Sequence, residues 1–148
     1  MPMPPRDPDH WLYRHTPREW IRASMGELRQ ARAAYERHNG RAGLAGCRRA
    51  AGVALNGLLA ALDAPDVTYG RTYMDHLAGA AADDRAPEAV REAARVLLVT
   101  PLPGGPIVAL RTATSDARAL DAAETVMAHA YAVVLKAEPL EGEEGQEG

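Results

Sequence analysis

The segment between residues 16 and 62 reads TPREWIRASMGELRQARAAYERHNGRAGLAGCRRAAGVALNGLLAAL. It predicts two long amphipathic helices joined at His38-Asn39-Gly40, because apolar residues recur at spacings of three and four on both sides of that turn. Its opening, Thr16-Pro17-Arg18-Glu19, is a capping box with proline at the first helical position. Two such helices cannot bury their apolar stripes alone, so the segment predicts a small all-α bundle.

The first helix is expected to bury Trp20, Ser24 or Met25, Leu28, Ala31 and Tyr35, and to end at Asn39-Gly40 with a left-handed cap. The second is expected to run from about residue 41 to 62. Its glycines, each of which costs about 1 kcal/mol relative to alanine, indicate that a neighbouring helix approaches closely. They are Gly43, Gly46, Gly52 and Gly57. Alternatively, the early glycines belong to a loop and the helix begins near Leu44.

The composition supports one soluble helical domain. The 148 residues include no Phe, only 5% aromatic residues and 47% hydrophobic residues, so small side chains must pack the core. The single cysteine, Cys47, excludes an intramolecular disulfide and a thiolate cluster. It is expected to be a small buried residue. Without a signal peptide or an apolar run of about 18 residues, the chain is expected to be cytoplasmic and not to enter a membrane.

Three further helices and two terminal segments complete the expected organisation. Thr68 is predicted to cap a helix over 69–82, Pro87 to open one through Leu98, and Thr114 or Ser115 to cap a last helix through Lys136. The result is a four- to five-helix up-down bundle over residues 16–136. Residues 1–15 form an N-terminal arm. The proline- and glycine-rich stretch 100–106 is either a rigid crossover or a functional lid, and the apolar run 107–110 is a strand-like or docked segment.

The end of the chain is acidic. Residues 137–148 contain five of the 20 acidic residues and no basic one, which leaves 15 acidic against 17 basic residues in the remainder. A segment so poor in apolar residues is expected to be disordered. It is either a solubilising end or a mimic that competes with nucleic acid for a basic surface.

The helical segments resemble the HEPN domain, an up-down helical bundle. The resemblance covers about residues 16–136 and rests on Trp20-Ile21-Arg22-Ala23, the run 50–59, Asp75-His76-Leu77 and the closing segment 119–134. Members usually carry charged residues where this chain has Gly52 or Val53 and Asn56. The family contains ribonucleases and toxins paired with a nucleotidyltransferase-type antitoxin, and also non-catalytic modules that are commonly dimeric.

The resemblance implies a candidate catalytic pair, Arg71 and His76. The nuclease branch uses an arginine and a histidine four to six residues apart, and Arg71-Thr72-Tyr73-Met74-Asp75-His76 fits that spacing. A histidine can move a proton at the 2'-hydroxyl or the leaving oxygen, and an arginine can stabilise charge on phosphorus. Thr72 departs from the polar amide, acid or histidine that usually follows the arginine. The alternative is that His76 is a half-buried structural residue with a hydrogen-bond partner, sharing a face with Tyr73.

Other candidates come from the residues themselves. Trp11 and Arg14 belong to an aromatic and basic cluster that could stack a base or hold a phosphate, and Tyr73 is a further candidate for binding. The alternative is that Trp11 and Leu12 pack the arm onto the bundle. Histidine and acidic residues do not recur at metal-ligand spacing around His129, so no metal and no cofactor is expected.

Three functions remain open. The first is a non-catalytic HEPN-like module that acts by homodimerisation and by binding a partner, a nucleotide or RNA. The second is a metal-independent ribonuclease, the toxin of a pair with a nucleotidyltransferase-type antitoxin, which would use Arg71 and His76. The third is a binder of a nucleotide or small ligand beneath the 100–106 loop.

Overall fold

The computed structural model describes residues 11–62, 69–101 and 113–138. These residues form a short 3-10 helix and five α-helices, with no strand among them, which confirms the all-α prediction. The helices are η1 (Trp11–Arg14), α1 (Pro17–Glu36), α2 (Gly40–Ala61), α3 (Tyr73–Ala82), α4 (Glu88–Val99) and α5 (Ala113–Ala137). The predicted strand-like run 107–110, most of the 100–106 loop and the acidic segment 139–148 lie outside the described residues. None of the described helices is both long and apolar enough to cross a bilayer.

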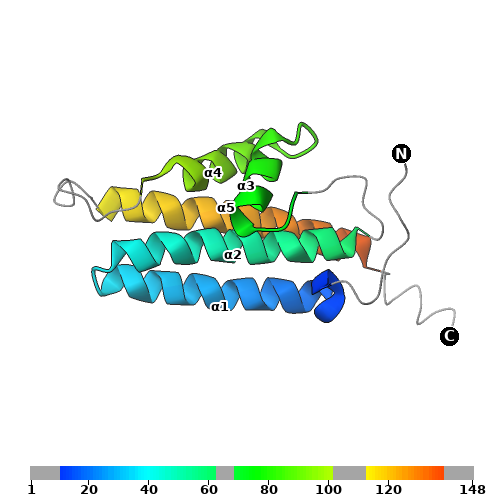
Figure 1. Cartoon of the computed structure of the whole chain (residues 1–148), viewed down its shortest axis with the longest axis horizontal. Coiled ribbons are helices and arrows are strands. Elements are labelled where there is room, and N and C mark those ends of the chain that lie inside the picture. Colours follow the sequence, from blue (N-terminus) through cyan, green and yellow to red (C-terminus); the bar gives the residue numbers. More distant parts are fainter. Residues whose placement is uncertain (1–10, 63–68, 102–112, 139–148) are drawn as a thin grey trace, which may run out of the picture.

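The three long helices lie side by side, and the shorter α3 and α4 pack on one side of them (Figure 1). Helix α2 is central because it packs against each of the other four α-helices. Every residue from Ala50 to Ala60 is buried. Burial on all sides explains why this segment, apart from Asn56, is apolar around its whole circumference rather than along one stripe.

The predicted start of the first helix is confirmed. The Thr16 hydroxyl accepts from the Glu19 amide at 3.1 Å, and the Glu19 carboxylate accepts from the Thr16 amide at 2.8 Å. These hydrogen bonds with Thr16 lower the pKa of Glu19. Pro17 occupies the first helical position, where no amide donor is needed.

The turn between α1 and α2 differs from the prediction. His38, with φ 60°, takes the left-handed position, and Gly40 is already a buried residue of α2. The amide of Asn39 donates to the Ala34 carbonyl at 2.8 Å, which closes α1. Its side-chain oxygen accepts from the Ala42 amide at 3.1 Å, which opens α2. Asn39 therefore caps the second helix, and the left-handed residue falls one position earlier.

The replacement His38→Gly is expected to raise the free energy of unfolding by about 0.5–1 kcal/mol, because a left-handed conformation is strained for residues with a Cβ atom and not for glycine. Urea denaturation followed by circular dichroism measures the change. The matched control is Arg37→Gly, where φ is −86° and glycine brings no relief. An equal effect of both variants would contradict the explanation.

The glycines of α2 belong to the helix, so the alternative that the early ones lie in a loop is wrong. A Cβ atom at Gly43 would stand 2.6 Å from the Tyr35 ring, and one at Gly46 would stand 2.8 Å from the Cβ atom of Ala31. A Cβ atom at Gly57 would stand 3.0 Å from the Pro17 carbonyl. All three contacts are with residues of α1. This confirms that the close approach of α1 is the reason for glycine at these three positions of α2.

The third helix begins four residues later than predicted, at Tyr73. Gly70 has φ 78°, which interrupts the helix before that point. Thr72 and Asp75 then form a capping box, with the Thr72 hydroxyl accepting from the Asp75 amide at 3.0 Å. Pro87 also differs slightly from its predicted place, since it is the N-cap residue of α4 rather than its first helical residue.

An arginine from α2 caps the carboxyl end of α4. The Nε atom of Arg48 donates to the Leu97 carbonyl at 2.7 Å, and its Nη2 atom donates to the Thr100 carbonyl at 2.8 Å. A cation at this end of a helix also complements the helix dipole. The contact fixes α4 against the central helix.

Candidate functional site

The candidate catalytic histidine lies inside the bundle. His76 has no exposed surface. Its Nδ1 atom is 3.0 Å from the Tyr69 carbonyl oxygen, and its Nε2 atom is 2.6 Å from the side-chain amide of Asn56 in α2. We name His76, Asn56 and the Tyr69 carbonyl the buried polar cluster.

The chemistry of the buried polar cluster is that of a neutral imidazole. Burial lowers the pKa of His76, so the uncharged ring is favoured. The Tyr69 carbonyl can only accept, so Nδ1 donates to it and Nε2 must accept. The atom that lies 2.6 Å from Nε2 is Oδ1 of Asn56, which cannot donate a hydrogen bond. Rotating the side-chain amide by 180° brings its NH2 group to this place, and the NH2 group then donates to Nε2. Both ring nitrogens are then occupied by the protein itself.

Arg71, the other residue of the candidate pair, lies at the surface. Arg71 is exposed in the turn before α3, and it forms no ion pair with a residue that the structure describes. Because the His76 ring has no exposed surface, the two side chains do not share a solvent-open surface. His76 is thus more completely buried than expected, and both of its ring nitrogens have hydrogen-bond partners, as the alternative interpretation predicts.

Tyr73, the third candidate from this segment, packs on the central helix. A Cβ atom at Gly52 would stand 2.5 Å from the Tyr73 ring, so the ring rests on the glycine. Tyr73 still exposes 38% of its surface. Glycine at position 52 therefore leaves the space that the Tyr73 ring occupies.

The aromatic cluster before α1 packs on that helix. Leu12 is buried, and its carbonyl accepts from the Trp20 indole at 2.8 Å. The rings of Trp11 and His15 meet the Trp20 ring edge-on, at centroid distances of 6.3 and 4.7 Å. This confirms the interpretation that Trp11 and Leu12 pack the arm onto the bundle. Arg14 is exposed at the end of η1, and His10 lies outside the described residues.

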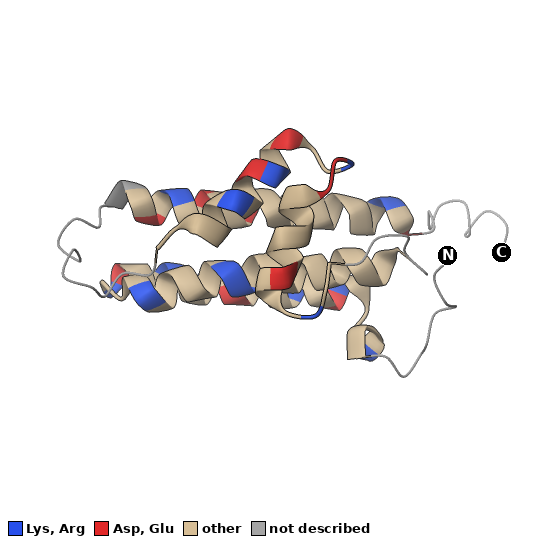
Figure 2. Ribbon diagram, turned by 45° about the horizontal axis from the view of Figure 1, so that its top comes forward, with Lys and Arg blue, Asp and Glu red and all other residues tan. Residues whose placement is uncertain are grey.

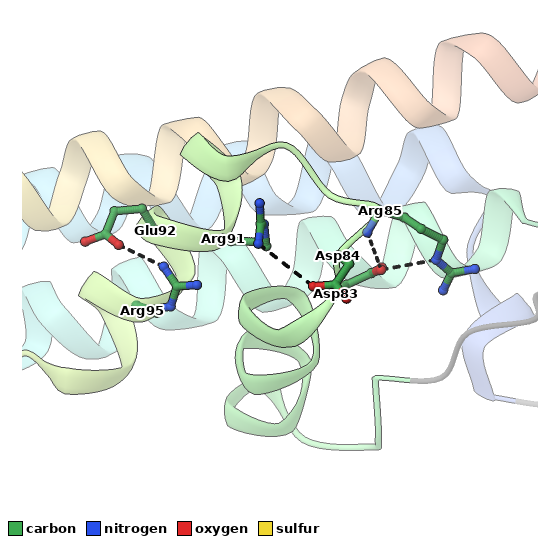
Figure 3. Close-up of polar contacts among 6 residues, drawn as sticks. All are labelled: Asp83, Asp84, Arg85, Arg91, Glu92 and Arg95. Atoms are coloured by element: carbon green, nitrogen blue, oxygen red, sulfur yellow. Dashed lines mark hydrogen bonds and ion pairs between the residues drawn. The ribbon is translucent and has the colours of Figure 1, made fainter.

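Ion pairs gather at the corner between α3 and α4 (Figure 3). The Tyr69 hydroxyl donates to Asp83 at 2.5 Å, and Asp83 also contacts Arg85. Burial alone would raise the pKa of Asp83, but the hydrogen bonds from Tyr69 and Arg85 hold it below its usual value. Burial also raises the pKa of Tyr69. At this corner the Asp83 carboxylate is therefore neutralised by Arg85 and hydrogen-bonded by Tyr69.

Two further ion pairs extend this corner along α4. Arg91 lies 4.0 Å from Asp84, and Arg95 lies 2.9 Å from Glu92. Charges of both signs alternate on α4 and on the turn before it, so no patch of one sign forms there (Figure 2). No group of three potential metal ligands occurs within residues 11–62, 69–101 and 113–138.

A different surface lies along α1 and α5. Arg18 forms a two-point ion pair with Glu138, with distances of 2.5 and 2.9 Å, and Arg32 pairs with Glu124 of α5. Between them, Arg22 and Arg29 are exposed and form no ion pair with any described residue. They follow Arg18 by four and eleven residues, spacings that keep them on the same side of α1.

Exposed apolar side chains accompany these arginines. Met25 of α1 and Leu135 of α5 each expose 42% of their surface, and Tyr131 of α5 is half-buried. We call the surface formed by Arg22, Arg29, Met25 and Leu135, bounded by the two ion pairs, the α1–α5 face. Sequence reasoning did not identify it. The spacing of the α1 arginines was a signal, but only the structure shows which of them pair with a glutamate among the described residues.

Comparison with known proteins gives no relative. The chain matches no protein-family model, and neither the curated proteins nor the solved structures include a match. The resemblance to HEPN domains therefore stays a prediction from the sequence.

Proposed function

We propose that this chain is a non-catalytic, HEPN-like helical module that binds a protein partner through the α1–α5 face. The observation that supports this most directly is that Arg22 and Arg29 are exposed and form no ion pair with a described residue, beside the exposed Met25 and Leu135. Exposed apolar side chains with arginines are typical of protein-binding surfaces, where arginine is enriched.

The chemistry of the face favours a segment that carries acidic and apolar side chains. Arg22 and Arg29 can each bind a carboxylate with two parallel hydrogen bonds. Met25 and Leu135 can cover an apolar side chain placed between them. A nucleic acid fits less well, because a phosphate backbone offers no apolar side chain to cover the exposed Met25 and Leu135. The proposed partner class is therefore an acidic segment of a protein, from a second subunit or from an antitoxin-type partner.

The absence of catalysis in this proposal rests on the buried polar cluster. A general base must come within hydrogen-bond reach of the proton that it removes. His76 has no exposed surface, and both its ring nitrogens have partners within the protein. Ribonuclease activity that uses His76 would require α3 to move away from α2.

Fluorescence anisotropy tests the binding proposal. The probe is a labelled peptide of alternating glutamate and leucine, titrated with the full chain. We expect the double variant Arg22→Gln/Arg29→Gln to bind it at least tenfold more weakly, and added NaCl to weaken binding of the unaltered chain. The matched control, Arg91→Gln/Arg95→Gln, removes two arginines from α4 and should bind normally.

The same experiment separates the other functions. A labelled single-stranded RNA that binds while the peptide does not would overturn the choice of partner class. RNA cleavage that disappears in Arg71→Ala would establish the nuclease instead, because Arg71 is exposed and its replacement leaves the core intact. We expect neither result.

A further inference from the structure

We infer that the acidic C-terminal segment of this chain, residues 139–148, binds to the α1–α5 face of its own molecule and competes there with the partner. This inference rests on the proposed function of the face. It adds regulation, because the partner must displace a segment that is always present.

Glu138, the residue that precedes the segment, is held at one end of the α1–α5 face. Helix α5 ends at Ala137, and the amide of Glu138 still donates to the Val134 carbonyl at 3.2 Å. The carboxylate of Glu138 is held by Arg18 through two contacts, Nε–Oε1 at 2.5 Å and Nη2–Oε2 at 2.9 Å. The chain therefore leaves the bundle beside the first arginine of the row, one helical turn from Arg22.

The composition of the segment matches the face. It reads Pro-Leu-Glu-Gly-Glu-Glu-Gly-Gln-Glu-Gly, with four glutamates and no basic residue. Leu140 directly precedes the glutamates and can cover Met25 or Leu135, while the glutamates meet Arg22 and Arg29.

The segment is also long enough. Arg18 and Arg29 are eleven residues apart on one helix, which corresponds to roughly 16 Å at 1.5 Å per residue. A chain of ten residues spans up to about 33 Å when extended. The segment is therefore long enough to pass both Arg22 and Arg29, with spare length for the path around their side chains.

The covalent connection between the segment and the bundle determines how strongly the segment binds the α1–α5 face. Exposed ion pairs are individually weak, so the segment as a free peptide would bind poorly. Joined to Glu138 by a short connection, it acts at an effective concentration in the millimolar range. A weak contact is then well populated within one molecule, yet a partner with more contacts can displace it.

The test compares the full chain with a full-length variant whose segment is neutral. The tail variant carries Glu141→Gln, Glu143→Gln, Glu144→Gln and Glu147→Gln. We expect it to bind the labelled glutamate and leucine peptide three- to tenfold more tightly than the unaltered chain, with a smaller difference at high salt. The charge-matched control carries Asp84→Asn, Glu88→Gln, Glu92→Gln and Asp121→Asn, and it should bind as the unaltered chain does.

A second measurement observes the arginines directly. In NMR spectra of the side-chain Nε groups, the Arg22 and Arg29 signals should differ between the unaltered chain and the tail variant, while Arg91 should not change. Equal peptide affinity and unchanged signals would overturn the inference and leave the proposed function standing. Absence of peptide binding by both proteins would overturn the proposed function itself. If the affinity difference grows with protein concentration, the segment binds a second copy, and the intramolecular contact is overturned.

Discussion

Replacing His76 with alanine is expected to lower the free energy of unfolding by about 3–4 kcal/mol. The change removes a fully buried side chain and leaves a cavity between α3 and α2. It also leaves the Asn56 amide and the Tyr69 carbonyl without their partner, and each unsatisfied buried group costs about 1–3 kcal/mol. Chemical denaturation measures the loss. Arg71→Ala, five residues earlier but exposed, should change stability by less than about 0.5 kcal/mol.

The pH dependence gives an independent readout of the same residue. The pKa of His76 is lowered in the folded protein, so the unfolded chain binds more protons once the pH falls below the ordinary histidine value of about 6.5. Stability should therefore fall as the pH is lowered through and below that value, by at most about 1.4 kcal/mol per pH unit for this group. His129, whose pKa burial also lowers, adds to the slope.

The variant His76→Leu should have a shallower slope between pH 7 and 5 than the unaltered chain, because one of the two histidines no longer titrates. A double-mutant cycle with Asn56→Leu completes the test. Losing both members of the pair should cost less than the sum of the single losses, since neither is then left unsatisfied. An unchanged slope together with additive losses would show that the buried polar cluster does not stabilise the fold in this way.

The replacement Gly46→Val is expected to destabilise the protein by about 2–3 kcal/mol. A Cβ atom there would stand 2.8 Å from the Cβ atom of Ala31 and 3.2 Å from its Cα atom. Backbone atoms cannot move aside as a flexible side chain can, so α1 and α2 would have to separate. Thermal and urea denaturation measure the loss.

The matched control is Gly26→Ala in α1. A Cβ atom at Gly26 would stand 3.6 Å from the Nη2 atom of Arg29, the mobile end of a long side chain. Alanine is the better helix former by about 1 kcal/mol, so this variant should be more stable than the unaltered chain. If both replacements stabilise the protein, close packing is not the reason for glycine at position 46.

Local signals in the sequence located some helix ends and misplaced others, such as the start of the last helix, which begins at Ala113 and so includes the expected caps Thr114 and Ser115. Thr16 with Glu19 marked the start of α1 correctly because a capping box depends only on residues three apart. The same kind of signal, Thr72 with Asp75, is present at the start of α3, whereas the prediction had placed the cap at Thr68. At the α1–α2 turn the sequence was ambiguous in principle, because an asparagine can end one helix or begin the next.

The contacts of the candidate site could not be read from the sequence in the same way. Asn56 in an apolar run was visible as an anomaly, but its pairing with His76 depends on how α3 is placed against α2, twenty residues away. The α1–α5 face depends in the same way on which glutamates of α5 reach α1. Packing between distant segments decides both, and no local pattern encodes it.

The enclosure of α2 has a consequence for the order in which the chain can fold. The last helix supplies a buried stripe of small and branched residues that closes one side of α2; it consists of Ala119, Ala122, Ala123, Val126, Met127, Ala130 and Val134. A chain still being synthesised, ending before residue 113, therefore exposes an apolar side of its central helix, α2. Such non-local closure slows folding and makes incomplete chains prone to association. The hairpin of α1 and α2 should need α5 before it becomes stable, although it is made first.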